Sequence, residues 1–333
     1  MLRRLNNQAF TIGLIAAVVF AFWFPTHGAT GGTLKTEITT KLSIALIFFF
    51  QGLSLETRKL LASATHFRLH VFCQSWIFIL SPALMLLLLF VFGRWIPQAL
   101  HPGLLYLSIL PTTISSSTSL TASSNGDAGA ALFSATFSNI AGVIVSPLWC
   151  LALFANTRGQ FPAFGSMIAK IAIYILLPLV IGQIARPFLP KTIEKLQAFF
   201  KRANNALIVF VVYAAFSNSV ADNLWQSFSW TSIAIALIAS FIYLLLLSSL
   251  VWTSSELSDK DIRLRIAAFF CGSQKTLAAG VPMAGIIFAG QSGSTQESLI
   301  ILPLMLYHAL QLFLAGIVKT RLAAIVDATT PTQ

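Results

Sequence analysis

The chain has 333 residues, of which 56% are hydrophobic and 9% are charged, and its mean hydropathy is +0.82. A water-soluble domain needs more polar side chains than this to cover its surface, so the composition predicts an integral membrane protein. The net charge of +11 would also suit a nucleic-acid-binding protein, but no segment interleaves basic and aromatic residues, and we expect no nucleic-acid partner.

Ten apolar segments are long enough to cross a bilayer, at about 20 residues per crossing. The first follows Arg3 and Arg4 and has no small-x-small cleavage site before Pro25, so we interpret it as a retained span rather than a signal peptide. The predicted spans are residues 9–24, 39–55, 71–95, 103–123, 128–155, 164–186, 204–221, 228–252, 266–290 and 296–318.

The basic residues indicate the direction in which the spans run. If the N-terminus is cytoplasmic, fifteen of the 21 basic residues fall in inner segments and four in outer segments, while Lys170 and Lys275 fall within spans. Basic residues gather in cytoplasmic loops, so this bias predicts a multi-pass protein with both termini in the cytoplasm.

Ten spans divide into two sets of five that run in opposite directions, which is the topology of inverted repeats in secondary transporters. We place the repeats at residues 1–160 and 161–333. The fourth span is rich in hydroxyl residues after Pro111, and the equivalent ninth span carries Lys275 ahead of Pro282. Helix-breaking sequences at equivalent positions are typical of transporters whose binding site lies where discontinuous helices meet.

The fourth and fifth spans offer oxygen atoms that suit a hard cation such as sodium, because hydroxyl groups and unwound carbonyls are its preferred ligands. The alternative is helix packing through small residues, which serine and threonine also serve. Ser134 and Ser138 of the fifth span share one helical face and are compatible with either role. The candidates on the fourth span are Ser115, Ser116, Ser117 and Thr118.

Lys275 lies within an apolar span, where an ionisable side chain is costly and by default marks a functional site. Three roles are open: a fixed cation in place of a coupling ion, a proton carrier, or a counter-charge for an anionic substrate. A lysine that only snorkels to the interface is the fourth interpretation, and its polar neighbours disfavour it. These neighbours are Gly272, Ser273, Gln274 and Thr276.

Isolated polar residues in the other spans are interpreted mainly as hydrogen-bonding partners between helices. His308 and Gln311 belong to this class, whereas Gln74 in the third span is also a candidate cation ligand. The three cysteines lie in apolar segments without a metal-binding or disulfide pattern, so we expect them to be packing residues.

Signatures of catalysis are missing from the sequence: it contains no HExxH, GxSxG or P-loop pattern. All ten acidic residues map to loops or to the ends of spans. We therefore expect no enzymatic activity and no cofactor apart from a coupling ion, either sodium or a proton.

Four segments carry a family likeness: residues 49–55, 111–126, 146–147 and, most specifically, 270–275. Over residues 9–320 the chain resembles the bile acid:sodium symporter family. The resemblance is to a branch that joins uncharacterised bacterial members of about this length to a vertebrate secretory-pathway member.

The resemblance implies an all-α membrane protein of ten helices in two inverted five-helix repeats. Spans 3–5 and 8–10 would form a core domain, spans 1, 2, 6 and 7 a panel domain, and spans 4 and 9 would be unwound where they cross. Family members move organic anions together with sodium, and the core moves against the panel to give alternating access.

The resemblance also assigns roles to residues of this sequence. One sodium site would use Ser116, Ser117 and Thr118 with Ser134 and Ser138, and the other would use Gln274 with Gln74. The remaining substrate or coupling candidates are Lys275, Ser273, Thr276, Ser115 and Asn125.

Two departures change the expected chemistry. Phe270 stands where the family has a glutamate that binds both ions, and Lys275 stands where it has an asparagine. The local charge shifts by two units toward positive, which repels sodium by several kcal/mol in a partly dry site.

We therefore expect a secondary transporter of a small organic anion in the inner membrane of a bacterium, a sodium-coupled symporter by resemblance. The alternatives are a proton-coupled or sodium-independent carrier that uses Lys275, and a membrane sensor that does not transport. Nothing in the sequence indicates an oligomeric state.

Overall fold

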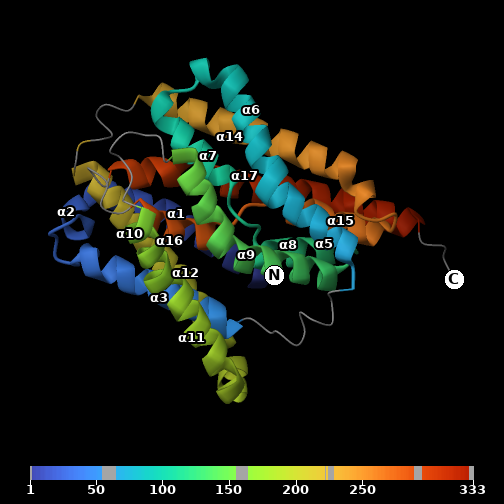
Figure 1. The fold of residues 1–333 in the computed structure, drawn as a ribbon, viewed down its shortest axis with the longest axis horizontal. Helices are drawn as coiled ribbons and strands as arrows, with labels where there is room; N and C mark the ends of the chain where they lie inside the picture. The colour runs from blue at the N-terminus through green and yellow to red at the C-terminus, as the bar shows by residue number, and fades with distance from the viewer. Residues whose placement is uncertain are drawn as a thin grey trace. The chain divides into compact units, whose positions relative to one another are not determined.

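The computed structural model describes residues 2–54, 65–154, 164–221, 223, 229–288 and 295–329. Within these ranges the ordered elements are all helices, and no strand is present (Figure 1). A helix satisfies its own backbone hydrogen bonds, which suits a chain of this hydropathy because lipid offers none. The predicted repeat boundary at residue 160 lies outside the described residues.

Six described helical stretches are long and apolar enough to cross a membrane, so the chain is a multi-pass membrane protein. The first predicted span appears as a shorter apolar helix, and the predicted fourth and ninth spans are each divided into two helices. The six stretches are Phe67–Trp95, Ala128–Phe154, Ile168–Phe188, Ala198–Ala221, Trp230–Leu257 and Glu297–Ala328.

Contacts between residues divide the chain into two units. Unit 1 contains residues 1–55, 154–230 and 280–301, and unit 2 contains residues 56–153, 231–279 and 302–333. The boundaries at residues 279–280 and 301–302 fall inside helices α16 (Leu277–Ile287) and α17 (Thr295–Thr329).

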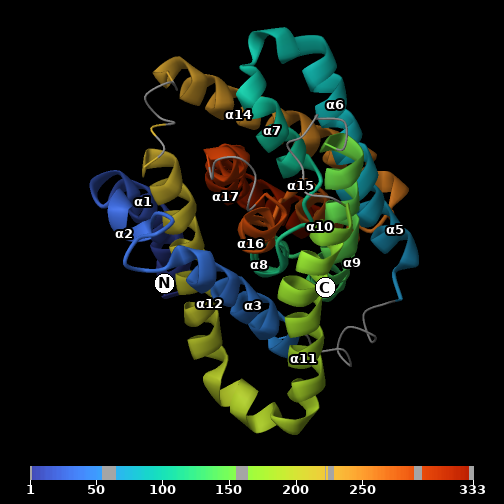
Figure 2. The same ribbon diagram turned by 60° about the vertical axis from the view of Figure 1, so that its left-hand side comes forward.

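Unit 1 is built around α3 (Thr36–Ser54), which packs against α11 (Leu177–Ala185) and α12 (Pro190–Ala221), while α1 (Leu2–Trp23) packs on α12 (Figure 2). Two glycines bring the backbones of α3 and α11 together. A Cβ atom at Gly52 would lie 2.2 Å from the carbonyl oxygen of Leu179, and one at Gly182 would lie 2.3 Å from that of Phe49. Neither position accepts a side chain, which is the usual reason for small residues between membrane helices.

Two long helices widen into a π turn just before a proline. The turn η1 (Trp76–Leu80) joins α5 (Phe67–Ser75) to α6 (Ser81–Phe92), and η4 (Ala172–Leu176) joins α10 (Phe164–Ile171) to α11. The N–H of Ser81 bonds to the carbonyl of Trp76, five residues back. The next residue is Pro82, which has no N–H, so the carbonyl of Ile77 receives no bond from it.

Unit 2 holds both divided spans. The chain leaves the helix at residues 109–113, between α7 (His101–Ser108) and α8 (Ile114–Ser123), and at residues 274–276, between α15 (Ile262–Ser273) and α16. The two breaks touch, because the N–H of Thr276 donates to the carbonyl of Pro111 at 2.9 Å.

Helix α9 (Ala128–Phe154) approaches the first break closely, since a Cβ atom at Gly142 would lie 2.7 Å from Cγ of Pro111. The cysteines in the described residues are buried and free, as expected of packing residues. Helix α14 (Trp230–Ser254) completes the long helices of unit 2. The remaining short elements are α2 (Pro25–Gly28), η2 (Gly93–Trp95), η3 (Gln98–Leu100), η5 (Arg186–Phe188) and η6 (Ser255–Leu257).

Candidate functional site

The ammonium group of Lys275 is the centre of the contact between the two breaks. Its side chain is fully buried, and Nζ donates to the carbonyl oxygens of Ile77 at 3.1 Å, Ser108 at 2.6 Å and Leu110 at 3.0 Å. An ammonium has three N–H donors, so all three are used. Every acceptor is a neutral backbone carbonyl, and no carboxylate within the described ranges pairs with this lysine.

Local structure explains why these carbonyls are available. The π turn and Pro82 leave the Ile77 carbonyl free of a helical donor, and Ser108 and Leu110 lie where α7 ends and its last carbonyls lack helical partners. A helix C-terminus carries partial negative charge, so a cation there is stabilising. Lys275 therefore caps α7 and the widened turn of the third span together.

The backbone of Lys275 is bonded on both sides by one glutamine. The N–H of Lys275 donates to Oε1 of Gln311 at 2.8 Å, and Nε2 of Gln311 donates to the Lys275 carbonyl at 2.9 Å. The hydroxyl of Tyr307 donates to the Ser273 carbonyl at 2.6 Å. Helix α17 thus replaces hydrogen bonds that the ninth span loses where it unwinds. The sequence indicated only an ordinary helix-to-helix bond for Gln311.

Beside Lys275, Oε1 of Gln274 accepts three hydroxyl groups. They are those of Thr113 at 2.6 Å, Ser116 at 2.8 Å and Ser117 at 3.1 Å. Ser117 also lies 3.1 Å from the carbonyl oxygen of Phe270. This oxygen cluster has the ligand type that hard cations prefer. The sequence did not indicate Thr113 as a site residue, because it lies before the run of serines and threonine at residues 115–119.

Comparison with known proteins identifies the family, since residues 8–324 match the SBF-like CPA transporter family. The chain belongs to this family. It is a transporter rather than an enzyme, and the resemblance to the bile acid:sodium symporters is confirmed.

Similar proteins occur in bacteria and vertebrates. "Putative symporter YfeH" of Escherichia coli is 33% identical over 319 residues, which cover 94% of this chain and 92% of that protein. "Sodium/bile acid cotransporter 7-B" of Xenopus laevis is 32% identical over 320 residues, covering 95% and 92%. "Sodium/bile acid cotransporter 7" of Rattus norvegicus is 31% identical over 320 residues, covering 95% and 93%.

A second cluster of polar side chains lies between the third span and α9. Ser134 Oγ lies 2.6 Å from Nδ1 of His70, and Nε2 of Gln74 donates to the Ser134 carbonyl at 3.2 Å. Oε1 of Gln74 is buried and has no hydrogen-bond partner among the described residues. Gln74 and Ser134 therefore come together, and no hydrogen bond described for either joins it to Gln274.

Three other predicted side chains, those of Ser138, Ser273 and Thr118, make no described hydrogen bond to Lys275 or Gln274. Ser138 and Ser273 donate within their own helices, to the carbonyls of Ala135 at 2.8 Å and Phe269 at 2.6 Å. The hydroxyl of Thr118 is buried without a partner in the described part of the chain.

Two further predicted site residues, Ser115 and Asn125, are exposed. Thr276 takes part in the contact between the two breaks through its backbone N–H. Asn125 has a positive φ of 57° and donates to Asp327 Oδ1 at 2.9 Å. No described contact brings Ser115 or Asn125 to Lys275, so their functional roles stay predictions.

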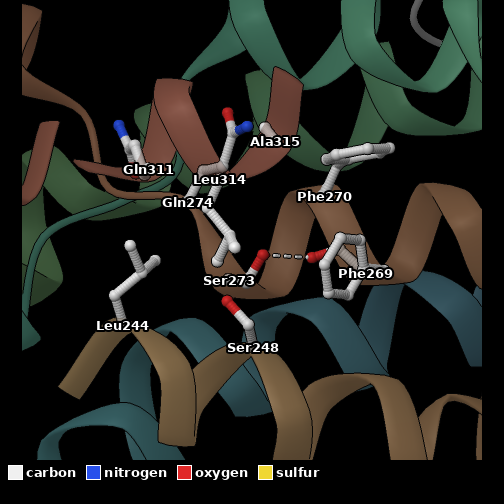
Figure 3. A pocket seen from close by; sticks show the side chains of 9 residues that line it. All are labelled: Leu244, Ser248, Phe269, Phe270, Ser273, Gln274, Gln311, Leu314 and Ala315. Carbon is white, nitrogen blue, oxygen red and sulfur yellow. Dashed lines mark hydrogen bonds between the residues drawn. The ribbon is translucent and has the colours of Figure 1, made fainter. Parts of the chain in front are cut away.

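A small pocket lies beside the cluster, between α14, α15 and α17 (Figure 3). Its volume of about 10 Å³ has room for one water molecule. Phe270 lines it next to Phe269, with ring centroids 5.0 Å apart. Gln274 also lines the pocket, and its buried Nε2 is without a partner among the described residues.

Proposed function

We propose that this transporter carries a small organic anion across the bacterial inner membrane by alternating access, with Lys275 as a permanently bound cation at the crossing of two broken spans. The observation that carries the proposal is the ammonium group held by three backbone carbonyls. The substrate class is supported by relatives named sodium/bile acid cotransporters.

Helix pairing supports the ten-span inverted repeat. In unit 1, α1 packs on α12 and α3 packs on α11, so predicted span 1 pairs with span 7 and predicted span 2 with span 6. A two-fold axis that exchanges the repeats exchanges these pairs. The breaks in spans 4 and 9 also exchange, and they bond to each other in unit 2.

The division of contacts supports the core and panel assignment. Spans 3–5 and 8 lie in unit 2 with the first half of span 9 and most of span 10, and spans 1, 2, 6 and 7 lie in unit 1. Two units with their own contacts suit a mechanism in which one body moves against the other.

The surroundings of Lys275 favour the fixed-cation role over the other two. A proton carrier or a counter-charge for substrate needs an ammonium that reaches water or ligand, and all three N–H groups of Lys275 are already bonded inside the protein. A bound ammonium needs no sodium gradient to occupy its place. One remaining sodium ion would bind at the Gln274 oxygen cluster, weakened by the nearby positive charge.

Sodium rescue tests the fixed-cation role. Lys275→Ala removes the ammonium and leaves a space surrounded by the carbonyls of Ile77, Ser108 and Leu110, which are sodium ligands. We expect sodium chloride, compared with choline chloride, to raise the melting temperature of this variant by more than that of wild type. Lys275→Met fills the same space without a charge, so sodium should not stabilise it more than wild type. Equal sodium responses in all three proteins would contradict the role.

Transport itself is tested in liposomes that contain the purified protein. Labelled carboxylates and sulfated steroids are offered under a sodium gradient, a proton gradient or neither. We expect uptake of at least one anion above that of protein-free liposomes. Absence of uptake for every anion under all three conditions would contradict the proposed function and favour a sensor.

A further inference from the structure

Glu297 in the first turn of α17 is a buried acid that no part of the proposed site uses. Its side chain is 9% exposed, and among the side chains that the structure describes it is the only buried acidic one. Its Oε1 atom is buried and has no hydrogen-bond partner in the described residues. The sequence placed this acid at the end of a span, and tertiary packing covers it there.

The carboxyl group packs against Gly285 in unit 1, where the absence of a side chain lets it come close to α16. A Cβ atom at Gly285 would lie 3.0 Å from Glu297 Oε1, 3.2 Å from Cδ1 of Ile44 and 3.8 Å from Cγ1 of Val211. Side chains of α3, α12 and α17 therefore meet at Gly285 of α16, and the Glu297 carboxyl is one of them.

No counter-charge is described beside it. Helix α16 has no ionisable residue, and the next turn of α17 presents the buried Ile300 and Ile301. The charged side chains that the structure describes on α3 and α12 are all exposed, and the other ionisable side chain described there, Tyr213, is half-buried and donates to the Phe24 carbonyl. The charged ones are Glu37, Lys41, Lys195, Lys201 and Arg202.

Two opposing effects act on this carboxyl. Burial without a counter-charge favours the neutral, protonated form. The first turn of a helix carries partial positive charge and favours the carboxylate. A carboxyl under both influences changes its protonation when its access to water changes.

We propose that Glu297 binds a proton in this state and releases it to water when the transport cycle exposes the carboxyl, which makes it a proton-coupling site. The proposal rests on the proposed transport function. The neutral carboxyl gives H⁺ to a water molecule and becomes a carboxylate, and the reverse step restores it.

Thermal unfolding against pH tests proton binding without any substrate. Wild type should lose melting temperature as the pH rises, because the folded state then has to bury a carboxylate that the unfolded state leaves in water. Glu297→Gln should lose this pH-dependent shift. The matched control is Glu256→Gln, which changes an exposed glutamate paired with Arg265 and should keep the wild-type dependence.

A sodium series at fixed pH distinguishes the two cations. If sodium raises the melting temperature of wild type and Glu297→Gln abolishes that rise, the carboxylate holds sodium and the proton proposal is overturned. If Glu297→Gln cannot be purified, Glu297→Asp keeps the carboxyl and should move the pH at which stability falls. An unmoved midpoint would overturn the proposal.

A pH-sensitive dye inside liposomes connects the site to transport. We expect anion uptake by wild type to change the internal pH, and Glu297→Gln to retain anion exchange while losing the pH change. Unchanged proton movement in this variant would overturn the inference and leave the transport function intact. Titration of Glu297 without any anion uptake would instead contradict the transport function alone.

Discussion

Each unit of the protein buries one lysine or acidic side chain among the described residues: Lys275 in unit 2 and Glu297 in unit 1. The surroundings of these two side chains are opposite. In unit 2, the ammonium of Lys275 has three acceptors for its three donors. In unit 1, Oε1 of Glu297 is buried and has no partner among the residues that the structure describes. Burial is nearly the same for both, so burial alone does not indicate a role. In the two proposals, the number of partners separates a charge that is held permanently from one that is exchanged.

Lys275→Met is expected to have the largest effect on stability. The methionine removes the lysine donor from three buried carbonyls, of which that of Ser108 keeps the bond from the Ser81 hydroxyl. An unpaired buried carbonyl costs ~1–3 kcal/mol, and the change relieves part of the cost of burying an ammonium. We expect a net loss of about 3 kcal/mol in the free energy of unfolding, measured by thermal or denaturant unfolding in detergent. Lys260→Met at an exposed position is the control and should change stability by less than ~0.5 kcal/mol. Equal stabilities of the two variants would remove the contrast with Glu297.

Gln311→Leu tests whether the hydrogen bonds between Gln311 and the backbone of Lys275 are needed for stability. The leucine leaves the N–H and the carbonyl of Lys275 unpaired, and we expect a loss of about 2 kcal/mol. The same unfolding measurement applies, with Gln98→Leu at an exposed position as control. A variant as stable as its control would mean that the broken ninth span finds other partners.

Gly285→Ala tests the space beside Glu297. The added methyl group would meet Oε1 at 3.0 Å, and overpacking of this kind costs about 1–2 kcal/mol. In a Glu297→Ala background the cost should be smaller, because that oxygen is gone, so the two changes should not add. Strict additivity in the double-mutant cycle would indicate that the carboxyl and Gly285 are independent.

Pro82→Ala is expected to have the smallest effect, about 0.5–1 kcal/mol, because it supplies a helical N–H that competes for the Ile77 carbonyl. In the Lys275→Ala background it should reduce stabilisation by sodium, since one ligand is then occupied. Pro178→Ala changes the corresponding proline after η4, in the other unit, and should leave the sodium response unchanged. The same response after both changes would show that the Ile77 carbonyl is not a ligand.

The breaks themselves could be predicted, because Pro111 and the polar run around Lys275 are visible in the sequence. The sequence also indicated Ser116, Ser117 and Gln274, which the structure brings together. The partners of Lys275 could not be predicted, since backbone carbonyls come from residues of any type. Only the helix ends and the π turn make those carbonyls available.

The partner of Gln74 and the burial of Glu297 could not be predicted, because they depend on helix rotation and on packing between distant segments. Gln74 faces Ser134 of α9, and no described hydrogen bond joins it to Gln274, an outcome set by the rotation of the third span. Glu297 lies against Gly285 of another helix, and the other neighbours of Gly285 are Ile44 and Val211 from two further helices. No local pattern around residue 297 carries that information.

The π turn before Pro82 has a consequence for the evolution of relatives. Lysine at 275 and proline at 82 supply one donor and free one acceptor of the same hydrogen bond. A relative that replaces the lysine leaves the Ile77 carbonyl unpaired unless position 82 regains an N–H or an ion takes the place of the ammonium. Substitutions at these two positions should therefore be correlated across the family, although 193 residues of sequence separate them (275 minus 82).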